Sequence, residues 1–321
     1  MKALNRWRWL AVTLVSCWAP AAVAQTDYPS EPVHLVAPFS PGGAADTVAR
    51  IISAPLSESL GQPVVVENKA GAGGSIGSAS VASAEPDGLT LLLNLGPPHQ
   101  TVHLFNEAVK YDPVNDFTAI AMVAKAPQVL AVPASSPYDT AAEFIEAARE
   151  QELTFGSSGI GTSQHLGGLL LNEAEGTQLI HIAYRGGSEA LAALLGEQTD
   201  AGIVVLSNVV PYIKSGQLKA LAVLEDSRAA NAPDIPTIGE ALGNDFSVPE
   251  TWVGVLGPAG LPDDITARLH DDINAALEQE ETIKLLENAG YEPRSATSEE
   301  FSEQLKSSEE MYRRLVSKTS K

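Results

Sequence analysis

Residues 33–60 read VHLVAPFSPGGAADTVARIISAPLSESL, and this stretch decides the fold class. Residues 33–37 form a short apolar run that predicts a buried strand. From Ala44 to Leu60 the apolar residues recur at helical spacing, so we expect a helix there, with a kink at Pro55. A strand that leads through glycines into a helix begins a βα unit, which is typical of parallel sheets.

The same alternation continues along most of the chain. Further strands are predicted at residues 64–67, 90–93, 119–123, 128–132, 154–155, 178–183, 201–206, 220–223 and 252–256. Further helices are predicted at residues 75–84, 140–150, 162–174, 188–195, 209–215, 263–278, 282–288 and 298–316. Strands that alternate with helices in this way predict an α/β fold with parallel strands and right-handed crossovers.

The elements divide into two series, which we interpret as two lobes. Lobe 1 would comprise residues 25–124 and 247–321, and lobe 2 residues 125–246, with chain crossings near 125–132 and 246–256. Each lobe would be a mainly parallel sheet flanked by helices. Two crossings of this kind suit a clamshell that closes on a ligand between the lobes, with hinges at the crossings.

Residues 1–24 have the features of an export signal, and we expect cleavage after Ala24. Three basic residues precede a short apolar run at residues 9–15, and small residues occupy positions 22 and 24. An alternative is lipoprotein processing, with Cys17 lipidated. Because Cys17 is the only cysteine, a chain cut after Ala24 would have none, which excludes disulfides and thiol chemistry.

Composition limits the classes of partner. The 321 residues include 40 acidic and 20 basic side chains, a net charge of −20, and removal of the basic signal segment takes this to −23. Nucleic acids and anionic lipids are polyanions, so this acidic chain is not expected to bind them. An apolar share of 44% is ample for a packed core, and the length suggests about two domains.

Residues 38–46 form a candidate anion site after the first strand. Gly42 and Gly43 allow a sharp turn and leave the first N–H groups of the following helix uncovered. Unpaired amides and the positive end of the helix dipole favour an anion without any lysine or arginine. The alternative is an ordinary loop in which Asp46 only caps the helix.

Residues 155–165 repeat this design in the second series. The run from Gly156 to Ser163 imitates a nucleotide-binding loop, but Thr162 occupies the lysine position, so a nucleoside triphosphate is not expected. Small hydroxyls and bare amides suit a compact anion such as a carboxylate. His165 falls in the first helical turn, where the dipole disfavours its charged form, and we expect a neutral packing or hydrogen-bonding role.

Other strand ends carry hydrogen-bonding side chains. Arg185 could pair with an anion or simply neutralise nearby acids. The strand-end positions that could line a ligand site, or alternatively cap the next helix, are Asn94, Gly96, Ser207 and Asn208.

Three chemical motifs are set aside. Residues 73–77 match the G-x-S-x-G elbow of serine hydrolases, but Ser75 does not directly follow a strand. Residues 71–76 lack the third glycine of a dinucleotide site. His99 and His103 could share a helix face, but nothing nearby completes a metal site. We therefore predict no catalytic residues, no metal and no cofactor.

Short motifs run in order through the whole chain after Ala24. They are Tyr28-Pro29, Pro38-Phe39, Pro41-Gly42-Gly43, Asp46, residues 61–68, residues 71–74, Pro86-Asp87-Gly88, Thr90-Leu91, Asp116-Phe117, Gly159-x-Gly161-Thr162-x-x-His165-Leu166, Tyr184-Arg185-Gly186, Gly196-x-Gln198-x-Asp200, residues 220–223 and Pro236-Thr237. No single motif is decisive. The ordered set resembles the tripartite tricarboxylate transporter receptors, also called Bug solute-binding proteins.

The resemblance implies a two-lobed receptor with the type II-like clamshell of periplasmic binding proteins, closing on a small carboxylated solute. It also implies that main-chain amides and waters from two glycine loops, one per lobe, hold the carboxylate. The matching ligand-binding candidates are Phe39, Gly42, Gly43, Ala44 and Asp46 in lobe 1, and Ser157, Ser158, Gly159, Thr162, His165 and Tyr184 in lobe 2. The chain departs from the family pattern at Glu189-Ala190, at Ala193 and at residues 95–99, near the expected cleft.

From these observations we expect a periplasmic, monomeric receptor that is not an enzyme. It would capture a small organic mono- or dicarboxylate by lobe closure and deliver it to membrane subunits of a tripartite tricarboxylate-type transporter. One alternative is a ligand-sensing input or interaction module of a sensor protein. A less favoured alternative is an exported hydrolase, in which Ser75 would be the nucleophile.

Overall fold

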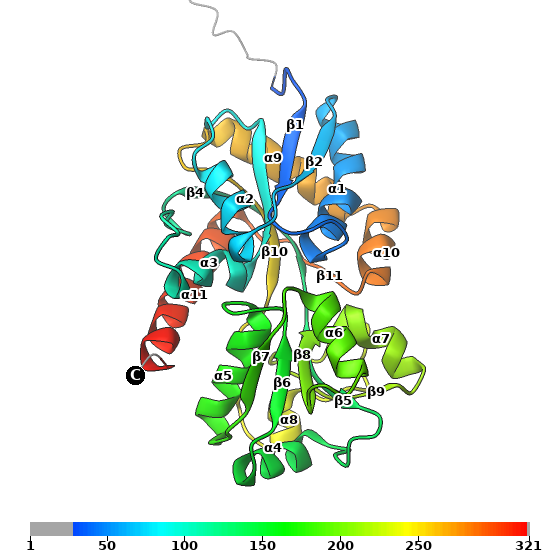
Figure 1. Ribbon diagram of the computed structural model, residues 1–321. Coiled ribbons are helices and arrows are strands. Elements are labelled where there is room, and N and C mark those ends of the chain that lie inside the picture. The colour runs from blue at the N-terminus through cyan, green and yellow to red at the C-terminus, as the bar shows by residue number, and fades with distance from the viewer. Residues whose placement is uncertain (1–27, 320–321) are drawn as a thin grey trace, which may run out of the picture.

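Figure 1 shows a computed structural model of the chain, which describes residues 28–319. The predicted signal peptide and Cys17 lie outside the described residues. Within residues 28–319, no helix combines the length and the apolar character needed to cross a membrane. The described chain forms two sheets with helices around each, and Figure 1 places one sheet above the other.

The upper sheet has six strands in the order β11-β4-β10-β3-β1-β2. β1 pairs in parallel with both β2 and β3, whereas β10 pairs antiparallel with β3 and β4. β11 pairs antiparallel with β4, so four of the six strands run in one direction. The strands are β1 (Val33–Ala37), β2 (Val64–Asn68), β3 (Thr90–Leu95), β4 (Phe117–Lys125), β10 (Trp252–Pro258) and β11 (Glu292–Pro293).

The lower sheet has five strands in the order β7-β6-β8-β5-β9. β6 pairs in parallel with β7 and β8, and β5 pairs antiparallel with β8 and β9. Four of its five strands therefore run in one direction. The strands are β5 (Gln128–Pro133), β6 (Thr154–Ser157), β7 (Ile180–Ala183), β8 (Ala201–Val205) and β9 (Leu218–Val223).

The sheets are mainly parallel, as predicted, and each also holds one antiparallel strand between parallel ones. These strands, β5 and β10, are the first strands that the chain forms after each passage between the sheets. Each of these strands begins at the edge of its sheet that faces the other sheet and runs away from it. The parallel strands run toward that edge, so the directions are opposite. Each sheet is therefore mixed.

The helices agree closely with the predicted ranges, with two additions. The sequence did not predict α3 and α8. α3 begins directly after β3, and α8 begins after Thr237, which caps it. The helices are α1 (Ala44–Leu60), α2 (Ser75–Ala82), α3 (Gly96–Phe105), α4 (Ala141–Glu150), α5 (Ser163–Glu175), α6 (Gly187–Leu195), α7 (Leu206–Lys214), α8 (Ile238–Leu242), α9 (Asp263–Leu277), α10 (Glu280–Asn288) and α11 (Ser298–Thr319). A short 3₁₀ turn, η1 (Ala72–Gly74), precedes α2.

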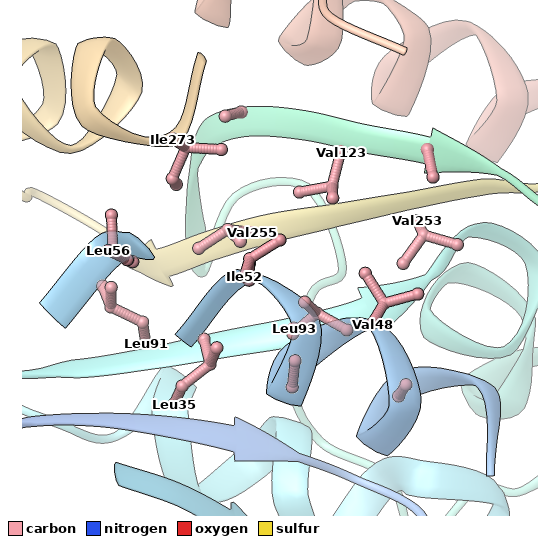
Figure 2. Packing of buried hydrophobic residues seen from close by; sticks show 14 of the residues in the cluster. Leu35, Val48, Ile52, Leu56, Leu91, Leu93, Val123, Val253, Val255 and Ile273 are labelled. Atoms are coloured by element: carbon pink, nitrogen blue, oxygen red, sulfur yellow. The ribbon is translucent and has the colours of Figure 1, made fainter. Parts of the chain in front are cut away.

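The core of the upper sheet shows why residues 44–60 are helical. Val48, Ile52 and Leu56 lie four residues apart, on one face of α1, and all three are fully buried. Figure 2 shows them on the side of α1 that faces β3 and β10, in one cluster with Leu93 of β3 and Val255 of β10. Each such side chain contributes roughly 1.5–3 kcal/mol on burial. This face fixes α1, and hence the turn before it, against the sheet.

A glycine on α5 gives a sharp test of packing in the lower core. A methyl group at Gly168 would lie 2.1 Å from Cζ of the fully buried Phe155, whereas one at Gly167 would lie 3.2 Å from a Leu224 methyl. We expect Gly168→Ala to lower the free energy of unfolding by about 1–3 kcal/mol, because the ring must move. Gly167→Ala should be close to neutral, since helix propensity offsets the mild contact. Urea denaturation of both variants checks this, and equal stabilities would contradict it.

Candidate functional site

The carboxyl ends of the parallel strands of both sheets point at the junction between the lobes. α3 begins at the end of β3, and its Thr101 hydroxyl hydrogen-bonds to the Gly161 carbonyl in the loop after β6. A second contact across the junction joins Gly290, before β11, and Ser207 of α7. It is close, since a methyl group at Gly290 would lie 1.9 Å from Cβ of Ser207. The loops after β1 and β6 therefore lie at facing edges of the two sheets (Figure 1), where open α/β sheets bind ligands.

The loop after β1 is shaped by Asp46. Its Oδ2 accepts hydrogen bonds from the Gly42 N–H at 2.8 Å and from Nε of Arg50 at 3.0 Å. Asn68, at the end of β2, donates from Nδ2 to the Phe39 carbonyl at 3.1 Å. Asp46 is only 3% exposed, and its side chain holds the loop together. Gly42, with φ of +78°, supplies the left-handed turn that this arrangement needs.

Asp46 stays ionised in this environment. Burial alone would raise the pKa of its carboxyl, but hydrogen bonds from Arg50 and the Gly42 amide outweigh burial and lower the pKa below its ordinary value. The N–H groups of Ala44, Ala45 and Asp46 begin α1 and have no hydrogen-bond partner within residues 28–319. The loop thus presents free N–H donors, and the Asp46 side chain fixes the turn that carries them.

Phe39 joins this loop to the next glycine turn. A methyl group at Gly74 would lie 3.0 Å from Cζ of the Phe39 ring, and Gly74 has a φ of +92°. The ring therefore lies directly on the backbone of the turn before α2. Phe39 also packs on the core of the upper sheet. This position of the Phe39 ring would suit an apolar wall of the candidate ligand site.

The loop after β6 is closed by its own side chains. Thr162 donates from its hydroxyl to the Gly159 carbonyl at 2.7 Å and caps α5 by accepting the His165 N–H at 3.4 Å. Ser158 donates to Oε1 of Gln164 at 2.8 Å. The N–H groups left without a partner in the described chain are those of Ser158, Ile160, Ser163 and Gln164. This is a second set of free donors at a helix N-terminus.

His181, on β7, was not predicted from the sequence. Its Nε2 lies 2.6 Å from Oγ of the fully buried Ser157, and its ring stacks on His165 with 4.2 Å between centroids. Tyr184 follows the same strand and donates its N–H to the Ser157 carbonyl at 3.1 Å. The sequence carried a weak signal for His181, a polar residue in a short apolar strand, but not for its partner 24 residues away.

Four other candidates take different positions. Asn94 is 1% exposed, and its Nδ2 donates to Ser78 at 3.1 Å, so its side chain is used inside the lobe. Gly96 is a close-packing position, since a methyl group there would lie 2.7 Å from Nε1 of Trp252. Ser207 and Asn208 lie in the first turn of α7 beside the junction, where the Ser207 hydroxyl is buried without a partner within residues 28–319.

The possible hydrolase residues are occupied in other ways. Ser75 begins α2 and donates its hydroxyl to the Ala72 carbonyl at 2.9 Å. Ser157 and His181 do resemble the first two members of a catalytic triad, but the Ser157 hydroxyl is fully buried and accepts the Gly159 N–H at 3.1 Å. Across residues 28–319, no carboxylate orients His181.

Metal-binding side chains are dispersed in the described part of the chain. No group of three or more histidine, cysteine or acidic side chains there could hold a metal ion. His99 bonds to Asn94 and to the Pro113 carbonyl, while His103 lies 3.1 Å from Glu309 of α11. These two imidazoles serve the packing of α3.

The sequence is similar to proteins of one family. The model of the tripartite tricarboxylate transporter family receptor matches residues 48–320. A protein from the tcbD–tcbE intergenic region of Pseudomonas sp. (strain P51) is 38% identical over 291 residues, which cover 90% of this chain and 86% of that protein. BugT of Bordetella pertussis is 34% identical, with 92% and 93% of the two chains covered.

Solved structures agree. MatC from Rhodopseudomonas palustris, with bound malate, is 30% identical with a TM-score of 0.79, covering 90% of this chain and all of that one. An R. palustris protein with adipate is 29% identical with a TM-score of 0.83, covering 91% and 98%. The family match and the shared fold lead to one conclusion: this chain belongs to the tripartite tricarboxylate transporter receptors, a family of solute-binding proteins.

Proposed function

We propose that this chain is an exported periplasmic receptor that captures a small organic mono- or dicarboxylate and delivers it to membrane subunits of a tripartite tricarboxylate-type transporter. The observation that carries the proposal is the pair of free amide sets in the described chain. One set is the N–H groups of residues 44–46 in one lobe, and the other is those of Ser158, Ile160, Ser163 and Gln164 in the other lobe. Two helix N-termini at facing sheet edges favour an anion between them.

Neutral donors suit a chain of this charge. Several arginines are already paired with the chain's own acids, as Arg50 is with Asp46 and Arg149 with Glu175. Main-chain amides carry no net charge, so distant acids attract them less than they attract arginines, and screened from water amides hold an anion by charge-assisted hydrogen bonds. The malate and adipate in the two R. palustris relatives are ligands of the proposed chemical class.

Lobe closure is part of the proposal. The lobes would be residues 25–124 with 247–321, and 125–246, and they would move about the two chain crossings. Near these crossings the Ala126 N–H donates to the Thr251 carbonyl at 2.8 Å, so the two crossing segments lie side by side. Paired segments of this kind allow bending while holding the lobes in register.

A thermal-shift experiment tests the proposed function. The chain without its export signal is freed of bound ligand and titrated with a broad panel of small carboxylates that includes malate and adipate, with the neutral diamides of these two acids as controls. At a hundred times its dissociation constant, an acid should stabilise the fold by about 2.7 kcal/mol, a shift of a few degrees. The diamides should give no shift. Equal shifts from acid and diamide, or no shift across a broad panel of carboxylates, would reject the proposal and favour an interaction module.

A further inference from the structure

Two imidazoles lie face to face behind the loop after β6. His165, in the first turn of α5, and His181, on β7, stack with 4.2 Å between ring centroids and 28° between planes. Phe155 of β6 stacks on His181 at 5.0 Å, and Phe105 of α3 lies 5.5 Å from His165. A row of four rings therefore runs from the core of the lower sheet to α3. This helix belongs to the lobe of the upper sheet, here called the upper lobe; the lobe of the lower sheet is the lower lobe.

Each imidazole also holds one part of the loop. The Gly161 N–H donates to Nδ1 of His165 at 3.1 Å. Nε2 of His181 contacts Oγ of Ser157 at 2.6 Å, and the same Oγ accepts the Gly159 N–H at 3.1 Å. Residues 157, 159 and 161 are thereby fixed, directly or through one hydroxyl. The residues between them, Ser158 and Ile160, keep free N–H groups in the described chain.

We propose that His165 and His181 are positioning residues of the ligand site, which hold residues 157–161 so that the Ser158 and Ile160 amides stay turned toward a bound carboxylate. This inference rests on the function proposed above. Fixed donors bind an anion better than mobile ones because no ordering cost is left for the binding step. Neither histidine needs to touch the ligand.

The charge state of the pair supports this role. Burial lowers the pKa of His181 to about 4, and burial together with the charge of His181 lowers the pKa of His165 to about 4. Both rings are thus neutral at pH 7. A protonated His165 would carry a hydrogen on Nδ1 and could not accept the Gly161 N–H. Neutral rings also avoid the repulsion of two stacked cations.

Paired substitutions separate the hydrogen bonds from the ring stack. His165→Phe and His181→Phe keep an aromatic ring but remove the nitrogen. His165→Asn retains an acceptor near Nδ1, and His181→Gln retains a polar group near Nε2. Calorimetry with malate and adipate should show affinity about tenfold weaker in both Phe variants and within about threefold of wild type in Asn and Gln variants. Unchanged affinity in the Phe variants, or an equal loss in all four, would overturn the proposal.

Measurements without ligand keep this test separate from the proposed function. In the ligand-free wild type, imidazole ¹⁵N NMR should find the His165 proton on Nε2, with Nδ1 free to accept. The Gly159 and Gly161 amides should exchange with solvent about tenfold or more slower in the wild type than in the Phe variants. If the wild type binds no carboxylate of the thermal-shift panel but these results hold, only the proposed function fails. A proton on Nδ1 of His165, or unchanged exchange, overturns the positioning role whatever the ligand.

Discussion

Gly290→Ala is expected to weaken capture of malate or adipate about tenfold or more, while Gly260→Ala has little effect on affinity. Both glycines have nearly the same backbone conformation, with φ of +79° and +81°. A methyl group at Gly290 would lie 1.9 Å from Cβ and 2.5 Å from Cα of Ser207, whereas one at Gly260 would meet nothing within 4 Å. The first variant therefore combines backbone strain with a clash between the lobes, and the second has the strain alone.

The clash is with a helix backbone, so no side-chain rotation relieves it. Ser207 must move away from Gly290, which shifts one lobe relative to the other and so changes the spacing across the proposed ligand site. Calorimetric titration measures the loss of affinity, and urea denaturation gives the strain common to both variants, about 1 kcal/mol. Equal affinity losses in Gly290→Ala and Gly260→Ala would show that this contact does not govern capture.

Glu225 is expected to make the fold less stable as pH rises from about 5 to 8. The residue is 7% exposed, and burial raises the pKa of its carboxyl from 4.5 to about 8. Between these values the folded protein keeps a proton that the unfolded chain loses. The contribution is fully present below pH 4.5 and is lost as pH rises through 8.

Glu225→Gln isolates this contribution. Glutamine can still accept the Gln128 N–H, which lies 2.9 and 3.1 Å from the two Glu225 oxygens, but it has no charge to bury. Relative to wild type, the variant should be nearly neutral at pH 5 and more stable by roughly 3 kcal/mol at pH 8. Urea denaturation across this range measures the difference, with the exposed Glu152→Gln as a matched control. A difference that stays constant with pH would refute the expectation.

The sequence predicted most elements because the relevant signals are local. The apolar spacing of Val48, Ile52 and Leu56 defines α1, and the bounds agree with the structure. α3 was missed because residues 96–98 read Gly-Pro-Pro, which usually marks a loop. Proline is nevertheless tolerated in the first helical turn, where the missing N–H would have no partner. This element also carries Thr101 and Phe105, two contacts with the lower lobe.

The position of β10 could not be read from the sequence. Its pairing with β3 joins residues more than 150 positions apart, and nothing local specifies the antiparallel direction. Side-chain directions at strand ends are similarly hidden. Asn94 lies near the end of β3, at the sheet edge that faces the other lobe, yet Ser78 and His99 bind its amide inside the lobe. Strand ends thus predict where a site would lie, but they do not predict which side chains enter it.

The last helix leaves the upper lobe and reaches the lower one. Leu166 of α5 packs with Tyr312, Leu315 and Val316 near the end of α11, and all four side chains are buried. Parting the lobes on this side would hydrate these apolar groups, which raises heat capacity. The preference for the closed arrangement should therefore weaken on cooling. Temperature, and not only ligand, would then set how often the receptor stands open to its solute.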